Sequence, residues 1–212
     1  MAAIMSAADV AQFRSTGFVL KPQFFSTAEA AAMRRTVDEF QQRGLMASIL
    51  LDPAMENLQM AWLSLHSRLF QVLPWEPRVI EAVDALLCAA GVEVQYDQLF
   101  RKPGRTGAGT SFHTDNAYFK LRDPLKGVGM WIALDDSTVE NGTLHCASWA
   151  PGQAAPAHSK DPEQFGGELA IDDPANLLQS ATPCELPAGG VCFCECNDAL
   201  YLWPLLASRT TS

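Results

Sequence analysis

The chain has 212 residues, of which 48% are hydrophobic and 18% are charged, and its formal net charge is −9. These proportions exclude a disordered chain and predict one globular domain over residues 1–212, large enough to bury a core without disulfide or metal staples. The acidic balance also argues against nucleic acid as a partner, because an acidic surface repels phosphate groups.

No segment of the chain predicts a membrane span or a signal peptide. No stretch approaches the roughly 20 apolar residues of a spanning helix, and the N-terminal segment has no long apolar run. Three of the six cysteines, Cys192, Cys194 and Cys196, crowd together, unlike the spread of a disulfide framework. We therefore expect reduced thiols and a cytoplasmic location.

Residues 1–91 are predicted to be mainly helical. Ser6 and Ser26 each open a capping-box pattern, with Asp9 and Glu29 in the third helical position. The helix that follows Ser26 carries an apolar stripe at helical spacing, made of Ala30, Met33, Val37 and Phe40. The two serines therefore predict the first two helices.

Three further elements complete this part of the chain. A short apolar strand is expected over residues 18–20, between the two capped helices. A third helix is expected over residues 53–70, and a fourth over residues 77–90 with Gly91 as its C-cap.

After Gly91 the pattern of apolar residues changes from a period of 3.6 to a period of 2, which predicts strands. The candidate strands are residues 92–97, 110–116, 127–134, 144–149 and 186–196. Residues 151–182 are predicted to be a long loop with a short element near Leu169. Helices followed by many short strands predict an α+β domain with a β-sandwich or barrel core over residues 92–196.

A histidine and an aspartate lie two positions apart on the second of these strands. Residues i and i+2 of a strand point to the same face, so His113 and Asp115 project together. A facial triad of two histidines and one carboxylate holds non-haem iron(II) with open positions for a co-substrate and oxygen. Read without its surroundings, the pair is more simply a solvated pair of strand residues, because His-x-Asp often arises by chance.

Three motifs make up the surroundings of the pair: FHTDNAY at 112–118, GMWIALDD at 129–136 and ENGTL at 140–144. These motifs resemble the phytanoyl-CoA dioxygenase family of iron(II)/2-oxoglutarate oxygenases. Members of that family have a His-x-Asp strand, a Trp-Ile-Ala strand about eighteen residues later, and an Asn-Gly turn before the next strand. The resemblance covers most of residues 6–193 and implies a double-stranded β-helix, or jelly roll, with helices packed on one side.

The resemblance implies roles for several residues. His113 and Asp115 resemble the family's first two iron ligands, and Trp131 resembles the tryptophan beside the 2-oxoglutarate site. Tyr118 is expected near the site, and Lys102, which precedes a glycine-rich loop, is a candidate to steer the anionic co-substrate. From the residues alone, Trp131 is equally a core aromatic residue, Tyr118 a turn or core residue and Lys102 part of a solvated loop.

The resemblance ends at about Phe193, which leaves residues 194–212 as a divergent tail. The family's next features are a histidine that is the third iron ligand and an arginine that pairs with 2-oxoglutarate, but no histidine follows His158. The tail therefore predicts that final barrel strands are altered or missing, and an altered reading frame near Cys194 is one explanation. An apolar segment at 199–206 is available to cover an exposed sheet edge.

Replacement ligands for the missing histidine are conceivable in the tail. Cys192, Cys194 and Cys196 share one strand face if the strand continues, and a thiolate or Asp198 can in principle bind a metal. The simpler interpretation is that these cysteines are core residues.

The resemblance implies an iron(II)/2-oxoglutarate-dependent dioxygenase that hydroxylates a small organic or acyl substrate. Because the third iron ligand and the arginine are not visible, the alternative is a catalytically inactive relative that acts as a binding or regulatory protein. A further alternative is a metal-independent jelly roll that binds sugar or is structural. The sequence leaves the substrate and the oligomeric state open.

Overall fold

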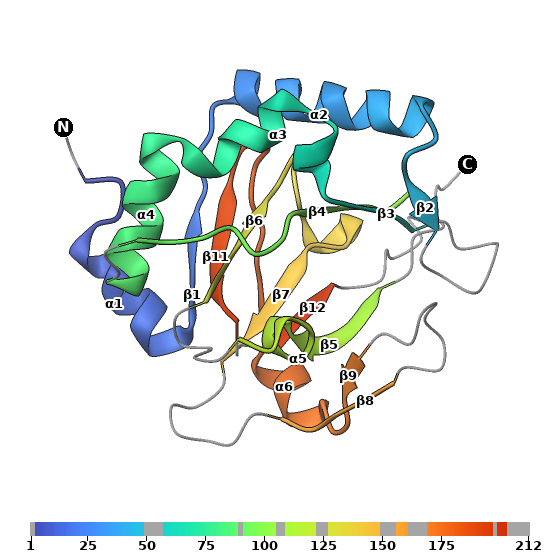
Figure 1. Cartoon of the computed structure of the whole chain (residues 1–212). Coiled ribbons are helices and arrows are strands. Elements are labelled where there is room, and N and C mark those ends of the chain that lie inside the picture. Colours follow the sequence, from blue (N-terminus) through green and yellow to red (C-terminus); the bar gives the residue numbers. More distant parts are fainter. Residues whose placement is uncertain are drawn as a thin grey trace, which may run out of the picture.

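The computed structural model describes residues 3–48, 57–88, 91–104, 109–121, 127–148, 156–160, 169–196 and 199–202 (Figure 1). Its α-helices and 3₁₀ turns are α1 (Ala7–Thr16), α2 (Thr27–Gln42), η1 (Leu63–Leu65), α3 (Arg68–Val72), η2 (Leu73–Trp75), α4 (Pro77–Leu87), α5 (Asp115–Phe119), η4 (Val139–Asn141) and α6 (Ala175–Ser180). Its strands are β1 (Phe18–Lys21), β2 (Ala47–Ser48), β3 (Leu58–Ala61), β4 (Gln98–Arg101), β5 (Thr110–Thr114), β6 (Val128–Ile132), β7 (Leu144–Ala147), β8 (His158–Lys160), β9 (Leu169–Ile171), β10 (Thr182–Pro183), β11 (Val191–Glu195) and β12 (Ala199–Leu202).

The first two helices begin where the capping patterns predict. The Ser6 and Ser26 hydroxyls accept hydrogen bonds from the backbone N–H groups of Asp9 and Glu29, whose carboxylates accept from the serine N–H groups in return. Each box satisfies backbone donors that a helix leaves without intrahelical partners. Gly17, at a φ of 79°, ends α1 in the left-handed conformation that glycine adopts at little cost.

The prediction of a third helix over residues 53–70 is wrong. Of its described part, Leu58–Ala61 forms β3, which pairs antiparallel with β4. Trp62 then adopts a left-handed conformation, with a φ of 58°, and the chain turns into η1 and the short helix α3. Pairing with β4 thus overrides a local apolar period that suits a helix.

Two other boundaries differ from the predictions. Cys88, at a φ of 50°, caps α4, so the helix ends before the predicted cap at Gly91. Residues 92–97, predicted as a strand, have no strand partner, and the strand that pairs with β3 begins at Gln98. The start of β4 is decided by its pairing with β3, and the end of α4 by the turn at Cys88. The local pattern of apolar residues contains neither of these.

Two sheets face each other and form the jelly roll that was predicted. One has the described strand order β1-β11-β6, and the other has the order β10-β7-β12-β5. Figure 1 shows α2 crossing above the strands, α1 and α4 beside β1, and the β8-β9 hairpin with α6 beyond β5. Helices α1, α2 and α4 therefore lie on the side of the first sheet, as expected for this fold class.

Alternating residues of the first sheet contribute to two separate cores. Val191 and Phe193 of β11 belong to a cluster with apolar residues of the helices, among them Met33, Val37, Phe40, Phe70 and Val79. Cys192 and Cys194 point to the opposite side, into a cluster between the two sheets that includes Leu144 and Cys146 of β7. Because successive strand residues face opposite sides, one strand holds both layers together.

The divergent tail supplies a strand to the second sheet. Ala199–Leu202 forms β12, which pairs antiparallel with β5 on one side and with β7 on the other. The apolar tail therefore fills a central place between two strands, where both of its edges are hydrogen-bonded. The remainder of the predicted covering segment, residues 203–206, lies outside the described residues. None of the described helices is both long and apolar enough to cross a membrane.

Candidate metal and co-substrate site

The junction between β5 and α5 brings His113 and Asp115 together. His113 is the last but one residue of β5, and Asp115 is the first residue of α5 rather than part of the strand as predicted. The His113 Nε2 atom lies 3.9 Å from the Asp115 Oδ1 atom, and the two side chains are 19% and 18% exposed. Two donor atoms of the kinds that bind iron(II) therefore lie side by side and only partly open to solvent.

The ring of His113 is oriented so that one nitrogen faces the aspartate. Its Nδ1 atom lies 2.8 Å from the Ser111 carbonyl oxygen, which only accepts hydrogen bonds, so Nδ1–H donates and Nε2 keeps its lone pair. The Tyr118 ring packs edge-on against the imidazole, with 5.4 Å between the ring centres. A histidine whose second nitrogen is held in this way is prepared to bind a metal through Nε2.

The carboxylate of Asp115 is mostly buried and lies close to β6 of the first sheet. Burial raises its pKa, and the neighbouring His113 opposes that rise only in part. A Cβ atom on Gly129 would lie 3.1 Å from Asp115 Oδ2 and 2.9 Å from the Cys194 sulfur. The glycine therefore leaves the space that the carboxylate occupies, and a cation beside it would favour the charged form.

Tyr118 is close to the pair but its hydroxyl has another partner. The hydroxyl accepts a hydrogen bond from the Leu169 N–H at 2.7 Å and lies 3.2 Å from the Leu169 carbonyl oxygen. The side chain thus connects the helix that carries Asp115 to β9. In this geometry Tyr118 positions the site, and its predicted role in co-substrate binding stays a prediction.

Trp131 lies on the interior face of β6, two positions along the strand from Gly129, and packs against the core between the sheets. Lys102 directly follows β4, which belongs to the sheet with order β2-β3-β4. Burial lowers the pKa of Lys102 to about 8. Arg105, the next basic residue along the chain, lies outside the described residues.

His158, assigned to a loop from the sequence, contacts the backbone between the two predicted ligands. It lies on β8, where its Nδ1–H donates to the Pro156 carbonyl at 2.8 Å and its Nε2 accepts from the Thr114 N–H at 3.1 Å. Burial lowers the pKa of His158, which favours the neutral ring that this acceptor role requires. No local pattern could identify this contact, since it joins residues 44 positions apart.

The strand beside the pair offers no obvious third ligand among its described residues. Leu200 is opposite His113 in the register between β12 and β5, and a leucine has no donor atom for a metal. Asp198 lies outside the described residues. Burial, with the nearby charge of Asp115, raises the pKa of Cys196 to about 12, which keeps this candidate thiol protonated.

Comparisons with known proteins agree with the family that the sequence motifs predict. A family model described as "Phytanoyl-CoA dioxygenase (PhyH)" matches residues 13–197. The chain belongs to this family. Phytanoyl-CoA dioxygenase domain-containing protein 1 of Mus musculus is 31% identical over 137 residues, which cover 59% of this chain and 44% of the mouse protein. Its homolog in Caenorhabditis briggsae is 28% identical over 113 residues, which cover 53% of this chain and 32% of that protein. The chain thus spans less than half the length of these relatives.

Solved structures confirm the fold of this family member. EvdO2 from Micromonospora carbonacea var. aurantiaca, complexed with 2-oxoglutarate, has a TM-score of 0.72 and 27% identity, covering 97% of this chain and 86% of EvdO2. SnoK, a non-heme alpha ketoglutarate dependent carbocyclase from nogalamycin biosynthesis, has a TM-score of 0.81 and 19% identity, covering 96% of this chain and 80% of SnoK. Both the family and the jelly-roll fold predicted from the sequence are confirmed. The roles of His113, Asp115 and Trp131 remain predictions.

Proposed function

We propose that this chain is an iron(II)/2-oxoglutarate-dependent dioxygenase that hydroxylates a small organic or acyl substrate. The observation that carries the proposal is the 3.9 Å separation of His113 Nε2 and Asp115 Oδ1 on the β5–α5 junction. The family membership and the 2-oxoglutarate in the complex of the related protein EvdO2 support the same assignment.

The residues present fit two of the three protein positions of a facial triad. His113 would bind iron(II) through Nε2, since its Nδ1–H is held by Ser111, and Asp115 would bind through its carboxylate. The cation would also offset the desolvation of the buried carboxylate. When bound, iron(II) together with 2-oxoglutarate would activate oxygen for hydroxylation of an unactivated C–H bond.

Lys102 and Trp131 are the proposed contacts for 2-oxoglutarate. The low pKa of Lys102 reflects the cost of burying an ammonium group, and a carboxylate ligand would repay part of that cost. Trp131 faces the interior on the same strand as Gly129, which borders Asp115, so it is suited to form an apolar wall of the co-substrate site.

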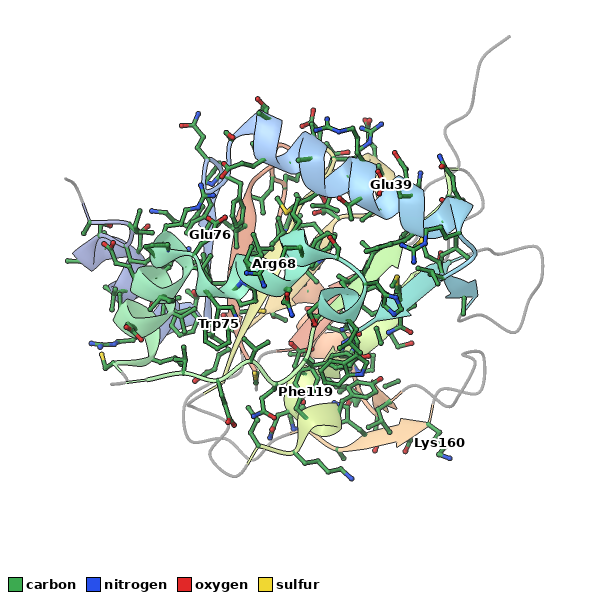
Figure 2. The ribbon with its side chains drawn as sticks, turned by 45° about the horizontal axis from the view of Figure 1, so that its top comes forward. Glu39, Arg68, Trp75, Glu76, Phe119 and Lys160 are labelled. Carbon is green, nitrogen blue, oxygen red and sulfur yellow. The ribbon has the colours of Figure 1, made fainter. Side chains whose placement is uncertain are left out.

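Aromatic residues near α5 support an apolar substrate. Trp62 packs edge-on against Tyr96 with 4.9 Å between ring centres, and Tyr96 lies 5.9 Å from Phe119 at the end of α5. Trp62 is 45% exposed. Figure 2 shows Phe119 on the side of the molecule away from Glu39 of α2. A partly exposed row of aromatic residues beside the helix that carries Asp115 can contact an acyl or aromatic group.

The second candidate function is a catalytically inactive relative that binds a partner or ligand. Leu200 of β12, opposite His113 in the second sheet, favours this alternative because a leucine has no donor atom for a metal. Two protein ligands hold a metal ion less firmly than three. The arginine expected for 2-oxoglutarate is not found in residues 194–202, and the one arginine later in the sequence, Arg209, lies outside the described residues.

Calorimetric titration of manganese(II), an air-stable substitute for iron(II), in the presence of 2-oxoglutarate tests the proposal. We expect micromolar binding that is lost in His113→Ala and kept in His66→Ala, a matched control because His66 is exposed after η1. Formation of succinate from 2-oxoglutarate under iron(II) and oxygen is then measured. Binding without succinate favours the inactive relative, and absence of binding in the unmodified chain refutes both the metal site and the oxygenase.

A further inference from the structure

Three buried thiols from three segments of the chain meet between the two sheets. Cys146 lies on β7, Cys184 directly follows β10, and Cys192 lies on β11 of the facing sheet. The Cys146 sulfur is 3.4 Å from that of Cys184 and 3.8 Å from that of Cys192, and the Cys184 and Cys192 sulfurs are 3.9 Å apart. All three side chains are fully buried.

These separations match the spacing of sulfurs around a metal ion. A disulfide requires about 2.05 Å between the sulfur atoms, so the three thiols are free. A tetrahedral ion with zinc–sulfur bonds of about 2.3 Å holds its sulfurs roughly 3.8 Å apart. A triangle with the observed sides has a circumradius of about 2.1 Å, so such an ion would lie roughly 0.8 Å out of its plane, close to the tetrahedral position.

The chemistry of the three thiols also suits a cation. Hydrogen bonding with Cys146 and then Cys192 lowers the pKa of Cys184. The contact with Cys184 raises the pKa of Cys146, and the contacts with Cys146 and Cys184 raise the pKa of Cys192. One thiolate can thus form with two thiols as donors, but three thiolates without a cation would repel one another in the core. A bound metal ion displaces the remaining protons and compensates the charge.

We propose that Cys146, Cys184 and Cys192 form a metal site for a thiophilic ion, Zn²⁺ or Cu⁺, which ties the two sheets of the barrel together. Thiolate ligands select these ions, whereas the imidazole and carboxylate of His113 and Asp115 suit iron(II). Cys194, whose thiol hydrogen-bonds with that of Cys192, is the nearest candidate for a fourth ligand. This site is independent of the proposed oxygenase function.

The site has a structural consequence because its ligands come from both sheets. Cys184 is held by its backbone N–H, which donates to the Leu144 carbonyl at 2.7 Å, so β7 and the segment after β10 already form one unit. Cys192 reaches that unit from β11, opposite Trp131 in the register with β6. An ion bound by all three sulfurs would therefore resist separation of the sheets, and its loss would lower the unfolding temperature.

Metal content measured on the whole chain tests the proposal. The chain is produced in zinc-supplemented medium, dialysed, and assayed for metal per protein by mass spectrometry. We expect about one zinc ion per chain in the unmodified protein and a loss of at least tenfold in Cys184→Ser. Cys88→Ser is the matched control, since Cys88 is exposed at the end of α4, and His113→Ala tests the other site. Both should retain zinc.

X-ray absorption at the zinc edge of the unmodified chain gives a test that needs no variant to fold. A shell of three or four sulfurs at about 2.3 Å supports the proposal, and a shell of nitrogen and oxygen alone overturns it. Copper in place of zinc, with the same dependence on Cys184, supports the three-thiol site and identifies Cu⁺ as the ion. Absence of stoichiometric metal in the unmodified chain, or zinc that depends on His113 rather than Cys184, overturns it.

Discussion

Replacement of Gly129 by alanine tests the geometry of the candidate iron site without changing either of its proposed ligands. The variant keeps His113 and Asp115, but the new Cβ atom would lie 3.1 Å from Asp115 Oδ2 and 2.9 Å from the Cys194 sulfur. Contacts this short require the two side chains to move, because β6 is held on β11 by its strand pairing. We therefore expect the carboxylate to shift by a few tenths of an ångström relative to the histidine.

The size of the effect follows from the crowding. Insertion of a methyl group into a packed interior costs about 1–3 kcal/mol. For a chain of this size each kcal/mol lowers the unfolding temperature by about 2–4 °C, so we expect a decrease of roughly 2–12 °C. A displaced metal ligand should weaken manganese(II) binding on the order of 10- to 100-fold.

Calorimetry of unfolding and manganese(II) titration with 2-oxoglutarate measure the two effects. Gly91→Ala is the matched control because a Cβ atom there meets nothing within 4 Å, and it should leave both quantities unchanged. In the double variant Gly129→Ala with Cys194→Ala, the closer of the two contacts is removed, so part of the stability should return. If Gly129→Ala binds manganese(II) as tightly as the unmodified chain, Asp115 is not a ligand in the geometry described here.

Two further predictions concern Glu29, which caps α2, and Tyr118, which connects α5 to β9. Glu29 has its pKa lowered from 4.5 to about 2, chiefly by its hydrogen bond with Arg78, so the ionised form stabilises the fold above pH 4.5 and this contribution is lost as the pH falls toward 2. Glu29→Gln should lower the free energy of unfolding by about 1 kcal/mol at pH 7, as measured by urea titration. The difference between the variant and the unmodified chain should be smaller at pH 3. A difference that does not change with pH would contradict a stabilising role for the ionised Glu29 carboxylate. Tyr118→Phe should lower the free energy of unfolding by up to about 1 kcal/mol and speed hydrogen exchange at the Leu169 amide, because the hydroxyl that holds this amide is removed. The affinity for manganese(II) should stay the same because the ring remains against His113. Unchanged exchange at Leu169 would refute the prediction.

Local patterns were sufficient for the parts of the protein that depend on neighbours in the chain. The two capping boxes predicted α1 and α2 because a serine and the acidic residue three positions later bond the same turn of helix. The proximity of the His113 and Asp115 side chains was also predicted, because the two residues are only two positions apart in the chain. This spacing is the same whether Asp115 continues β5 or begins α5. Short motifs around this pair were enough to predict the family and the jelly roll.

Contacts between distant segments decided the parts of the fold that local patterns did not predict. The apolar stretch predicted as a third helix became β3 because β4 was available as its partner, and the divergent tail became β12 because β5 and β7 each offered it an edge. The contact of His158 with the Thr114 N–H, and the meeting of three thiols from two facing sheets, depend on the same assembly. A single strand pattern specifies which face a side chain takes, but only the packing of one sheet on the other decides what that side chain meets.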